Sequence, residues 1–163
     1  MTVTVRPAHD EEMALVGELT YAAYAADGHI SSQDGYAAHL RDAATRAAQG
    51  ELYVAELDDE VVGTVTFCPQ GSAFTELAQA GEGEFRMLAV APPARRRGIA
   101  EALVSLCVER SRELGYDAVV LSSMAGQTDA HRLYERLGFR RTPDLDWSPV
   151  DGVELLAFRL DLI

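Results

Sequence analysis

The chain has 163 residues, 48% of them hydrophobic, and its 26 acidic and 14 basic residues give a net charge of −12. This length and apolar content predict one globular domain over residues 1–163 and exclude a disordered chain. The acidic balance disfavours non-specific nucleic-acid binding, and no apolar run reaches the roughly 18 residues that a membrane helix needs.

The first half of the chain predicts a strand, two helices and a hairpin. Alternating apolar residues indicate a strand over 2–6 that stops at Pro7. Helices are expected over 10–26 and over about 33–49, and hairpin strands over 52–57 and 61–68.

The second half alternates strands and helices after a loop over 69–83, in which 74–80 could add a helical turn. Strands are expected over 84–90, 118–122, about 139–141 and about 154–162, and helices over 98–114 and about 130–137. This order predicts an α/β fold with a mixed sheet.

A basic turn joins the strand at 84–90 to the helix that follows, with the sequence Arg95-Arg96-Arg97-Gly98-Ile99-Ala100. The free N–H groups of a first helical turn and the helix dipole attract a diphosphate, and Gly98 lets it approach the backbone. The turn matches neither the dinucleotide fingerprint nor the P-loop. The alternative reading is an exposed basic cluster that caps a helix.

A second motif lies 28 positions further on, in Ala130-His131-Arg132-Leu133-Tyr134-Glu135-Arg136-Leu137-Gly138-Phe139. Its apolar residues recur at helical spacing, which places Tyr134 on the buried face of a helix closed by Gly138. Together, [RQ]xxGx[GA] after a strand and then AxxLYxxxGF resemble the GNAT family, the Gcn5-related N-acetyltransferases.

The resemblance implies the acyl-CoA N-acyltransferase fold, whose mixed, mostly antiparallel sheet of six to seven strands has helices on both faces. It implies transfer of the acetyl group of acetyl-CoA to a primary amine of a small molecule or peptide, without a metal. The pantetheine would pair with the backbone of Leu88, Ala89 and Val90. The diphosphate would bind the turn formed by Arg95, Arg96, Arg97, Gly98, Ile99, Ala100 and Glu101.

By the same resemblance, Tyr134 would protonate the leaving thiolate and Glu84 would be the general base. A phenol (pKa ~10) protonates a thiolate (thiol ~8.5) at a cost of only about 2 kcal/mol. Direct transfer from an alkylammonium (~10.4) to a carboxylate (~4.3) costs roughly 8 kcal/mol, so Glu84 would need a desolvated amine or a water relay. Glu82 is a rival on the same strand face.

One position departs from the family pattern. Gln127 stands where an Asn commonly contacts the pantetheine, and we keep it as a candidate cofactor contact. His131 is expected at the rim.

On the acceptor side, the expected segments contain Tyr24, Asp27, His29 and Tyr36, and later Asp144, Asp146, Trp147 and Asp151. Carboxylates beside aromatic rings suit a cationic amine. Chance placement of acids in an acidic chain is the alternative.

Two other functions stay open: a GNAT-fold module that binds acyl-CoA without turnover, and an unrelated anion or nucleic-acid binder. Cys68 and Cys107 show no metal-ligand spacing and are expected to be reduced core thiols. We expect a cytoplasmic protein without membrane or nucleic-acid partners, and the resemblance suggests a homodimer. The chain contains no lysine, so it has no lysine side chain of its own to acetylate.

Overall fold

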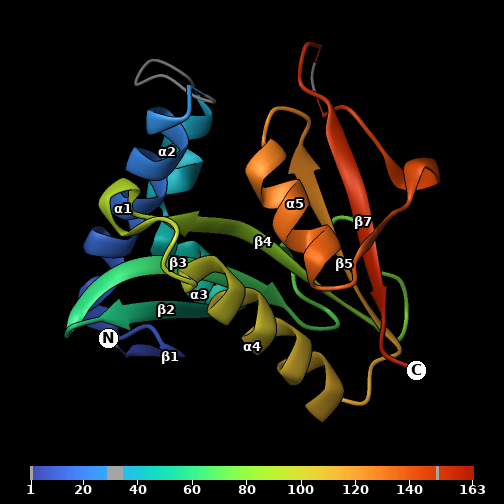
Figure 1. Ribbon diagram of the computed structural model, residues 1–163, viewed down its shortest axis with the longest axis horizontal. Coiled ribbons are helices and arrows are strands. Elements are labelled where there is room, and N and C mark those ends of the chain that lie inside the picture. The colour runs from blue at the N-terminus through green and yellow to red at the C-terminus, as the bar shows by residue number, and fades with distance from the viewer. Residues whose placement is uncertain (1, 29–34, 150) are drawn as a thin grey trace.

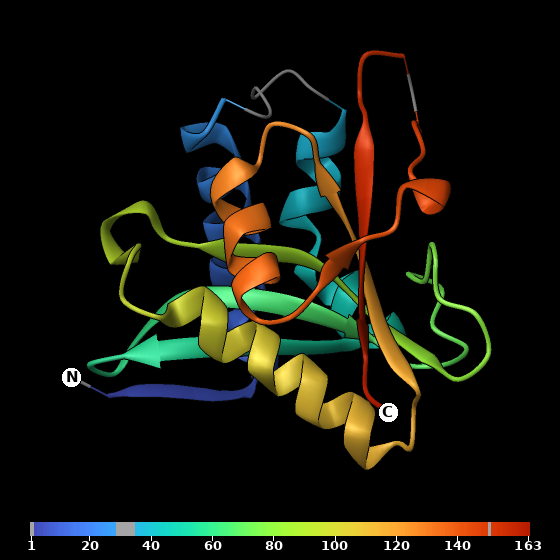
Figure 2. The same ribbon diagram turned by 45° about the vertical axis from the view of Figure 1, so that its right-hand side comes forward.

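The computed structural model describes residues 2–28, 35–149 and 151–163, in which one sheet carries helices on both faces (Figures 1 and 2). Seven strands form this sheet in the order β1-β2-β3-β4-β5-β7-β6. They are β1 (Val3–Pro7), β2 (Glu51–Leu57), β3 (Glu60–Cys68), β4 (Glu82–Val90), β5 (Ala118–Met124), β6 (Arg140–Arg141) and β7 (Leu155–Asp161). Among these seven strands of the described chain, only β4 and β5 are parallel neighbours, which confirms the expected mixed, mostly antiparallel sheet.

The helices divide between the two faces of the sheet. They are α1 (Met13–Ala26), α2 (Tyr36–Arg41), α3 (Ala43–Gln49), α4 (Ile99–Glu113) and α5 (Thr128–Arg136), with short 3-10 turns at Asp10–Glu12, Pro92–Ala94 and Pro143–Leu145. Figure 2 shows α4 and α5 in front of the sheet and α1, α2 and α3 behind it.

Apolar residues at helical and strand spacing bury both faces. On α4, Ile99, Leu103 and Cys107 recur every four residues and are at most 1% exposed. They share one core cluster with Phe67 of β3 and Phe85 of β4. A smaller cluster lies under α1 and α3, formed by Val16, Ala43, Leu52 and Val54.

The structure corrects three expected boundaries. The helix expected over 33–49 is two helices separated at Asp42, whose side chain caps α3 by accepting from the Thr45 amide at 3.1 Å; its expected start at 33–34 lies outside the described residues. No helical turn forms over 74–80. β1 includes Pro7, because an edge strand can hold a residue without an N–H.

Strand β4 contains a bulge in its middle. Two steps along β3, from Thr64 to Thr66, match three steps along β4, from Ala89 to Arg86. The inserted backbone includes Met87 in the left-handed region at φ 54°, which costs a residue with a side chain about 1 kcal/mol or more. A bulge bends and twists its strand, so the second half of β4 takes a new direction.

Past this region, β4 and β5 separate. They pair only through Glu82 with Ala118, Gly83 with Val119 and Glu84 with Val120. Figure 1 shows the strands diverging, with the end of β4 beside α1 and the end of β5 beside α5. The β4 edge facing β5 therefore has no strand partner over residues 85–90 in the described chain.

The contact between α1 and α2 gives a first prediction. A Cβ added at Gly17 would lie 2.2 Å from the carbonyl oxygen of Arg41, so the two helices could not keep their distance. We expect Gly17→Ala to lower the free energy of unfolding by about 1–3 kcal/mol, measured by denaturant titration. Gly35→Ala is the control, because its Cβ would meet nothing within 4 Å. Equal stability of the two variants would contradict this packing.

Candidate active site

The turn between β4 and α4 presents an open backbone. Gly98 caps α4 with φ 79°, and Arg96 also has a left-handed φ of 64°. A Cβ on Gly98 would meet nothing within 4 Å. The space in front of Gly98 is therefore open to a ligand.

Backbone amides of this turn lack partners. The Ala102 amide makes the first helical bond, to the Gly98 carbonyl oxygen at 3.1 Å. In the described chain, no hydrogen bond from the amides of Arg96, Gly98, Ile99, Ala100 or Glu101 to another group is found. Unpaired amides at the start of a helix form a site for an anion such as a diphosphate.

The side chain of Arg95 turns away from this opening, toward the end of α1. Its guanidinium contacts Asp27 Oδ1 at 2.5 Å, the Ala23 carbonyl oxygen at 3.2 Å and the Val90 carbonyl oxygen at 3.4 Å. Arg95 thus ties the turn to α1. Arg96 and Arg97 are exposed.

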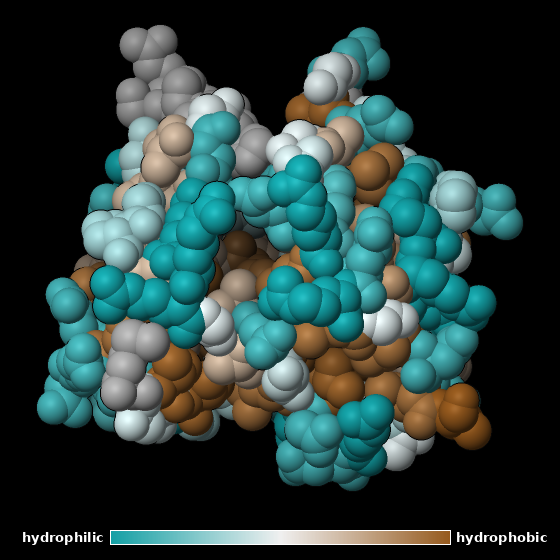
Figure 3. Space-filling model, in the orientation of Figure 1, coloured by the Kyte–Doolittle hydropathy of each residue, from teal (hydrophilic) through white to brown (hydrophobic). Residues whose placement is uncertain are grey.

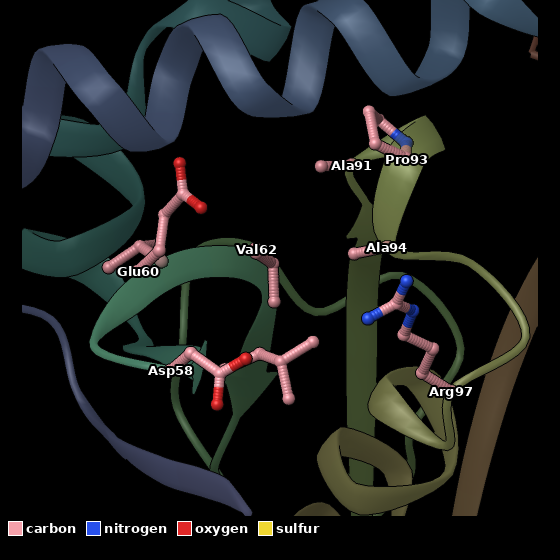
Figure 4. A pocket seen from close by; sticks show the side chains of 9 residues that line it. Asp58, Glu60, Val62, Ala91, Pro93, Ala94 and Arg97 are labelled. Atoms are coloured by element: carbon pink, nitrogen blue, oxygen red, sulfur yellow. The ribbon is translucent and has the colours of Figure 1, made fainter. Parts of the chain in front are cut away.

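A hollow of about 240 Å³ lies on the other side of the turn, between it and the β2–β3 hairpin (Figure 4). Its lining includes Asp58, Glu60, Val62, Ala91, Pro93, Ala94 and Arg97. The hollow adjoins the turn at 95–101 but does not reach the separation of β4 and β5. It therefore lies apart from the predicted pantetheine contacts and from Tyr134.

The predicted pantetheine contacts lie on the free edge of β4. Ala89 and Val90 pair with β3 on one side only, opposite Thr64 and Gly63. An extended chain can hydrogen-bond such an unpaired edge as an added strand. Figure 3 shows the surface hollowed between α1 and α5, with apolar groups at the bottom.

Tyr134 lies on the buried face of α5, as its spacing predicted, and is 4% exposed. Its ring packs against Phe85, Phe139 and Phe158, with centroids 5.5–5.9 Å apart. Burial raises the pKa of its phenol, so the hydroxyl stays protonated through neutral pH. Within the described chain we find no hydrogen-bond partner for this hydroxyl.

Gln127 stabilises the turn between β5 and α5. Its Oε1 accepts from the Met124 amide at 2.9 Å and from Ser123 Oγ at 3.1 Å. The hydroxyl of Tyr24 lies near the Gln127 side chain, and burial raises the pKa of this tyrosine. His131 Nε2 lies 3.1 Å from Ser123 Oγ and from the Met124 carbonyl oxygen, half-buried beside the same turn.

Glu84 is fully buried and holds a loop. Its Oε1 accepts hydrogen bonds from the amides of Glu76, Leu77 and Ala78 at 3.0, 2.8 and 3.0 Å. Its Oε2 is buried and has no partner in the described chain. Its side chain is 0% exposed, so it reaches an acceptor only through an intervening molecule such as water.

The rival carboxylate is engaged elsewhere. Glu82 pairs with Arg159 and accepts from the Gln79 amide at 2.9 Å. Both expected base candidates on β4 are therefore held by neighbouring groups.

The acids expected on the acceptor side do not form one cluster. Asp146 pairs with Arg141 at 2.7 Å and accepts from the Ala157 amide, which holds the pKa of that carboxyl below its usual range. Asp27 pairs with Arg95. Trp147 donates to Ser122 Oγ at 3.2 Å. His29 lies outside the described residues.

A pair that the motifs did not indicate lies on the face of the sheet covered by α1 and α2. Arg86 of β4 contacts Glu76 Oε1 through Nε at 3.1 Å and donates to the Phe74 carbonyl oxygen at 3.2 Å. Tyr36 of α2 lies near both Arg86 and Glu76. Glu76 comes from a loop without periodicity, so only the fold brings it here.

Cys68 and Cys107 are free and buried, as expected, and burial raises the pKa of both thiols. No cluster of metal-binding side chains is found among the residues that the structure describes. Within those residues, every helix is too short or too polar to cross a membrane.

The Glu84 contacts give a second prediction. We expect Glu84→Gln to lower the free energy of unfolding by about 1–3 kcal/mol and to speed hydrogen exchange at the amides of residues 76–78, because a neutral amide accepts less strongly. Glu109→Gln, on an exposed face of α4, is the control. Unchanged exchange at 76–78 would show that Glu84 does not hold the loop.

Comparisons with known proteins agree with this geometry. The sequence profile of the acetyltransferase (GNAT) family matches residues 18–139. The mouse probable N-acetyltransferase family 8 member 5 is 37% identical over 97 residues, which cover 58% of this chain and 40% of that protein. The Arabidopsis thaliana N-alpha-acetyltransferase MAK3 is 36% identical over 102 residues, 63% of this chain and 50% of that protein. The chain thus spans half or less of the length of these relatives.

Solved structures show the same fold. A GNAT-family acetyltransferase from Staphylococcus aureus superposes with a TM-score of 0.78 at 15% identity, covering 99% of this chain and 100% of that one. The Salmonella typhimurium protein yncA, solved with its cofactor acetyl-CoA, gives a TM-score of 0.70 at 20% identity, covering 100% and 95%. At these identities the likeness concerns the fold.

Proposed function

This chain belongs to the acetyltransferase (GNAT) family, and from that premise we propose that it transfers the acetyl group of acetyl-CoA to a primary amine. The amine belongs to a small molecule or a peptide and attacks directly in a ternary complex. The free thiols further support our proposal of a reducing, cytoplasmic location.

One observation carries this proposal: an open array of amides lies at the end of a strand whose edge is also unpaired. The first feature suits a diphosphate, and the second suits the extended pantetheine. The proposed contacts are the turn at 95–101 and the backbone of Leu88, Ala89 and Val90. Acetyl-CoA, when bound, supplies an acetyl thioester with a thiolate leaving group.

Tyr134 is our proposed general acid. It lies on the β5 side of the separation, in an apolar cluster that keeps its phenol protonated. Apolar surroundings also disfavour a free thiolate, so burial raises the pKa of the leaving thiol as well. The pKa difference between the phenol and the thiol therefore stays small.

Glu84 stays our sequence-based candidate for the base, but only through a water molecule. Because Oε1 accepts from three amides, only Oε2 is left for a proton, through a water. Gln127 would support the pantetheine by fixing the start of α5, since its oxygen is already used in the turn.

The third prediction tests the cofactor site. We expect Gly98→Asp to weaken acetyl-CoA binding about 100-fold or more, measured by calorimetry, because a carboxylate would occupy the space of the diphosphate and repel it. Gly115→Asp is the matched control, since Gly115 has a similar φ of 76° and open surroundings at the other end of α4. Retained affinity in Gly98→Asp would place the cofactor elsewhere.

The fourth prediction tests Tyr134. We expect Tyr134→Phe to lower kcat about tenfold with little change in acetyl-CoA affinity, because a thiolate leaves well even without an acid. Thiol release with polyamines, aminoglycosides, amino acids and N-terminal peptides measures it. Tyr53→Phe, whose hydroxyl donates to Glu51 on β2, is the control.

Unchanged turnover of Tyr134→Phe between pH 6 and 9 would remove Tyr134 from the mechanism. Acetyl-CoA binding without turnover of any amine would instead support an acyl-CoA-binding module.

A further inference from the structure

Three elements bring charged and phenolic groups together on the face of the sheet that α1 and α2 cover. Arg86 comes from β4, Glu76 from the loop between β3 and β4, and Tyr36 from α2. Tyr36 lies near Glu76 and Tyr24, and Tyr24 lies near Tyr134. Two tyrosines thus link the surroundings of Glu76 to those of the proposed acid.

Glu76 is mostly covered but keeps one oxygen available. Its side chain is 23% exposed, and Oε1 pairs with Arg86 at 3.1 Å. Within the described chain we find no hydrogen-bond partner for Oε2. Of the two carboxylates at this position, Glu76 is the one that can touch an acceptor, because Glu84 is 0% exposed.

Glu84 fixes the position of Glu76. One of the three amides that Glu84 holds is that of Glu76 itself, at 3.0 Å. A residue of a long loop is therefore anchored directly to the strand that borders the proposed thioester site. Such anchoring gives a loop carboxylate a defined position without regular secondary structure.

We propose that Glu76, in place of Glu84, is the catalytic residue that binds the acceptor ammonium and takes its proton, with Arg86 and Glu84 as positioning residues; this rests on the acetyl transfer proposed above. The ammonium N–H bond breaks and an O–H bond forms on Glu76, while the electron pair stays on nitrogen. That pair forms the C–N bond to the acetyl carbon as the C–S bond breaks. The sulfur leaves with its bonding electrons and takes the proton of Tyr134. The new amide nitrogen then gives its second proton to the Tyr134 phenolate, which leaves a neutral amide and restores the phenol.

The surroundings of Glu76 suit a proton acceptor. Burial raises the pKa of the Glu76 carboxyl, which brings it closer to the pKa of an ammonium group, while Arg86 opposes the rise. The charged or titratable groups facing it are Arg86 and Glu84 on β4, Tyr36 on α2 and Cys68 on β3. The ordinary gap between an ammonium and a carboxylate is about six pKa units, and the burial narrows it.

The test uses the 163-residue chain, acetyl-CoA and the best amine of the panel above. We expect Glu76→Gln to lower kcat/KM about 100-fold with the Kd for acetyl-CoA unchanged. We also expect the decrease of kcat/KM at low pH, the acid limb of the pH profile, to disappear in this variant. The backbone amide that Glu84 holds is kept in this variant, so the loop stays in place. Glu109→Gln is again the control.

A second variant tests the role of Arg86 while Glu76 stays in place. Arg86→Met takes away the cation that opposes the raised pKa, so the acid limb should move to higher pH by about one unit. A purely structural role would lower kcat without moving that limb.

The outcomes separate this proposal from the activity on which it rests. An acid limb that persists in Glu76→Gln while the wild type turns over overturns the role of Glu76 alone. If the acid-side fall in kcat/KM persists in Glu76→Gln but disappears in Glu84→Gln, the carboxylate that takes the ammonium proton is Glu84. A wild type that binds no acetyl-CoA or acetylates no amine overturns the activity, and with it this role.

Discussion

Strands β4 and β5 run side by side for three residue pairs and then separate, and the site depends on that separation. The bulge at Met87 redirects β4, so its free backbone edge faces the opening instead of another strand. The same strand then delivers the chain to the open turn before α4, while β5 leads to α5 and Tyr134. One irregularity in the sheet thus positions the proposed pantetheine edge, the proposed diphosphate turn and the proposed acid together.

Alternation along the strands makes the two faces of the sheet chemically different. Phe85 points into the apolar core beneath α4 and α5, whereas its neighbours Glu84 and Arg86 point to the α1–α2 face. The apolar side protects Tyr134 from ionisation. The polar side offers groups that can handle an ammonium and its proton, so a single strand separates the two halves of the proposed reaction.

Local patterns predicted the parts of the structure that local physics decides. Helical spacing placed Tyr134 on a buried face, and glycine with the helix start marked the turn at Gly98. The bulge at Met87 and the contacts of Glu84 depend on residues distant in sequence, so no periodicity signals them. Glu76 illustrates the same limit, because it lies in an aperiodic loop and gains its surroundings only when α2 and β4 meet there.

Arg95 was expected at the phosphates by resemblance, and its guanidinium instead joins the cofactor turn to Ala23 and Asp27 at the end of α1. Tyr24 lies on that same helical turn. The proposed coenzyme turn and the helix that carries Tyr24 are therefore joined by a direct side-chain contact, so a shift in either of them loads the other.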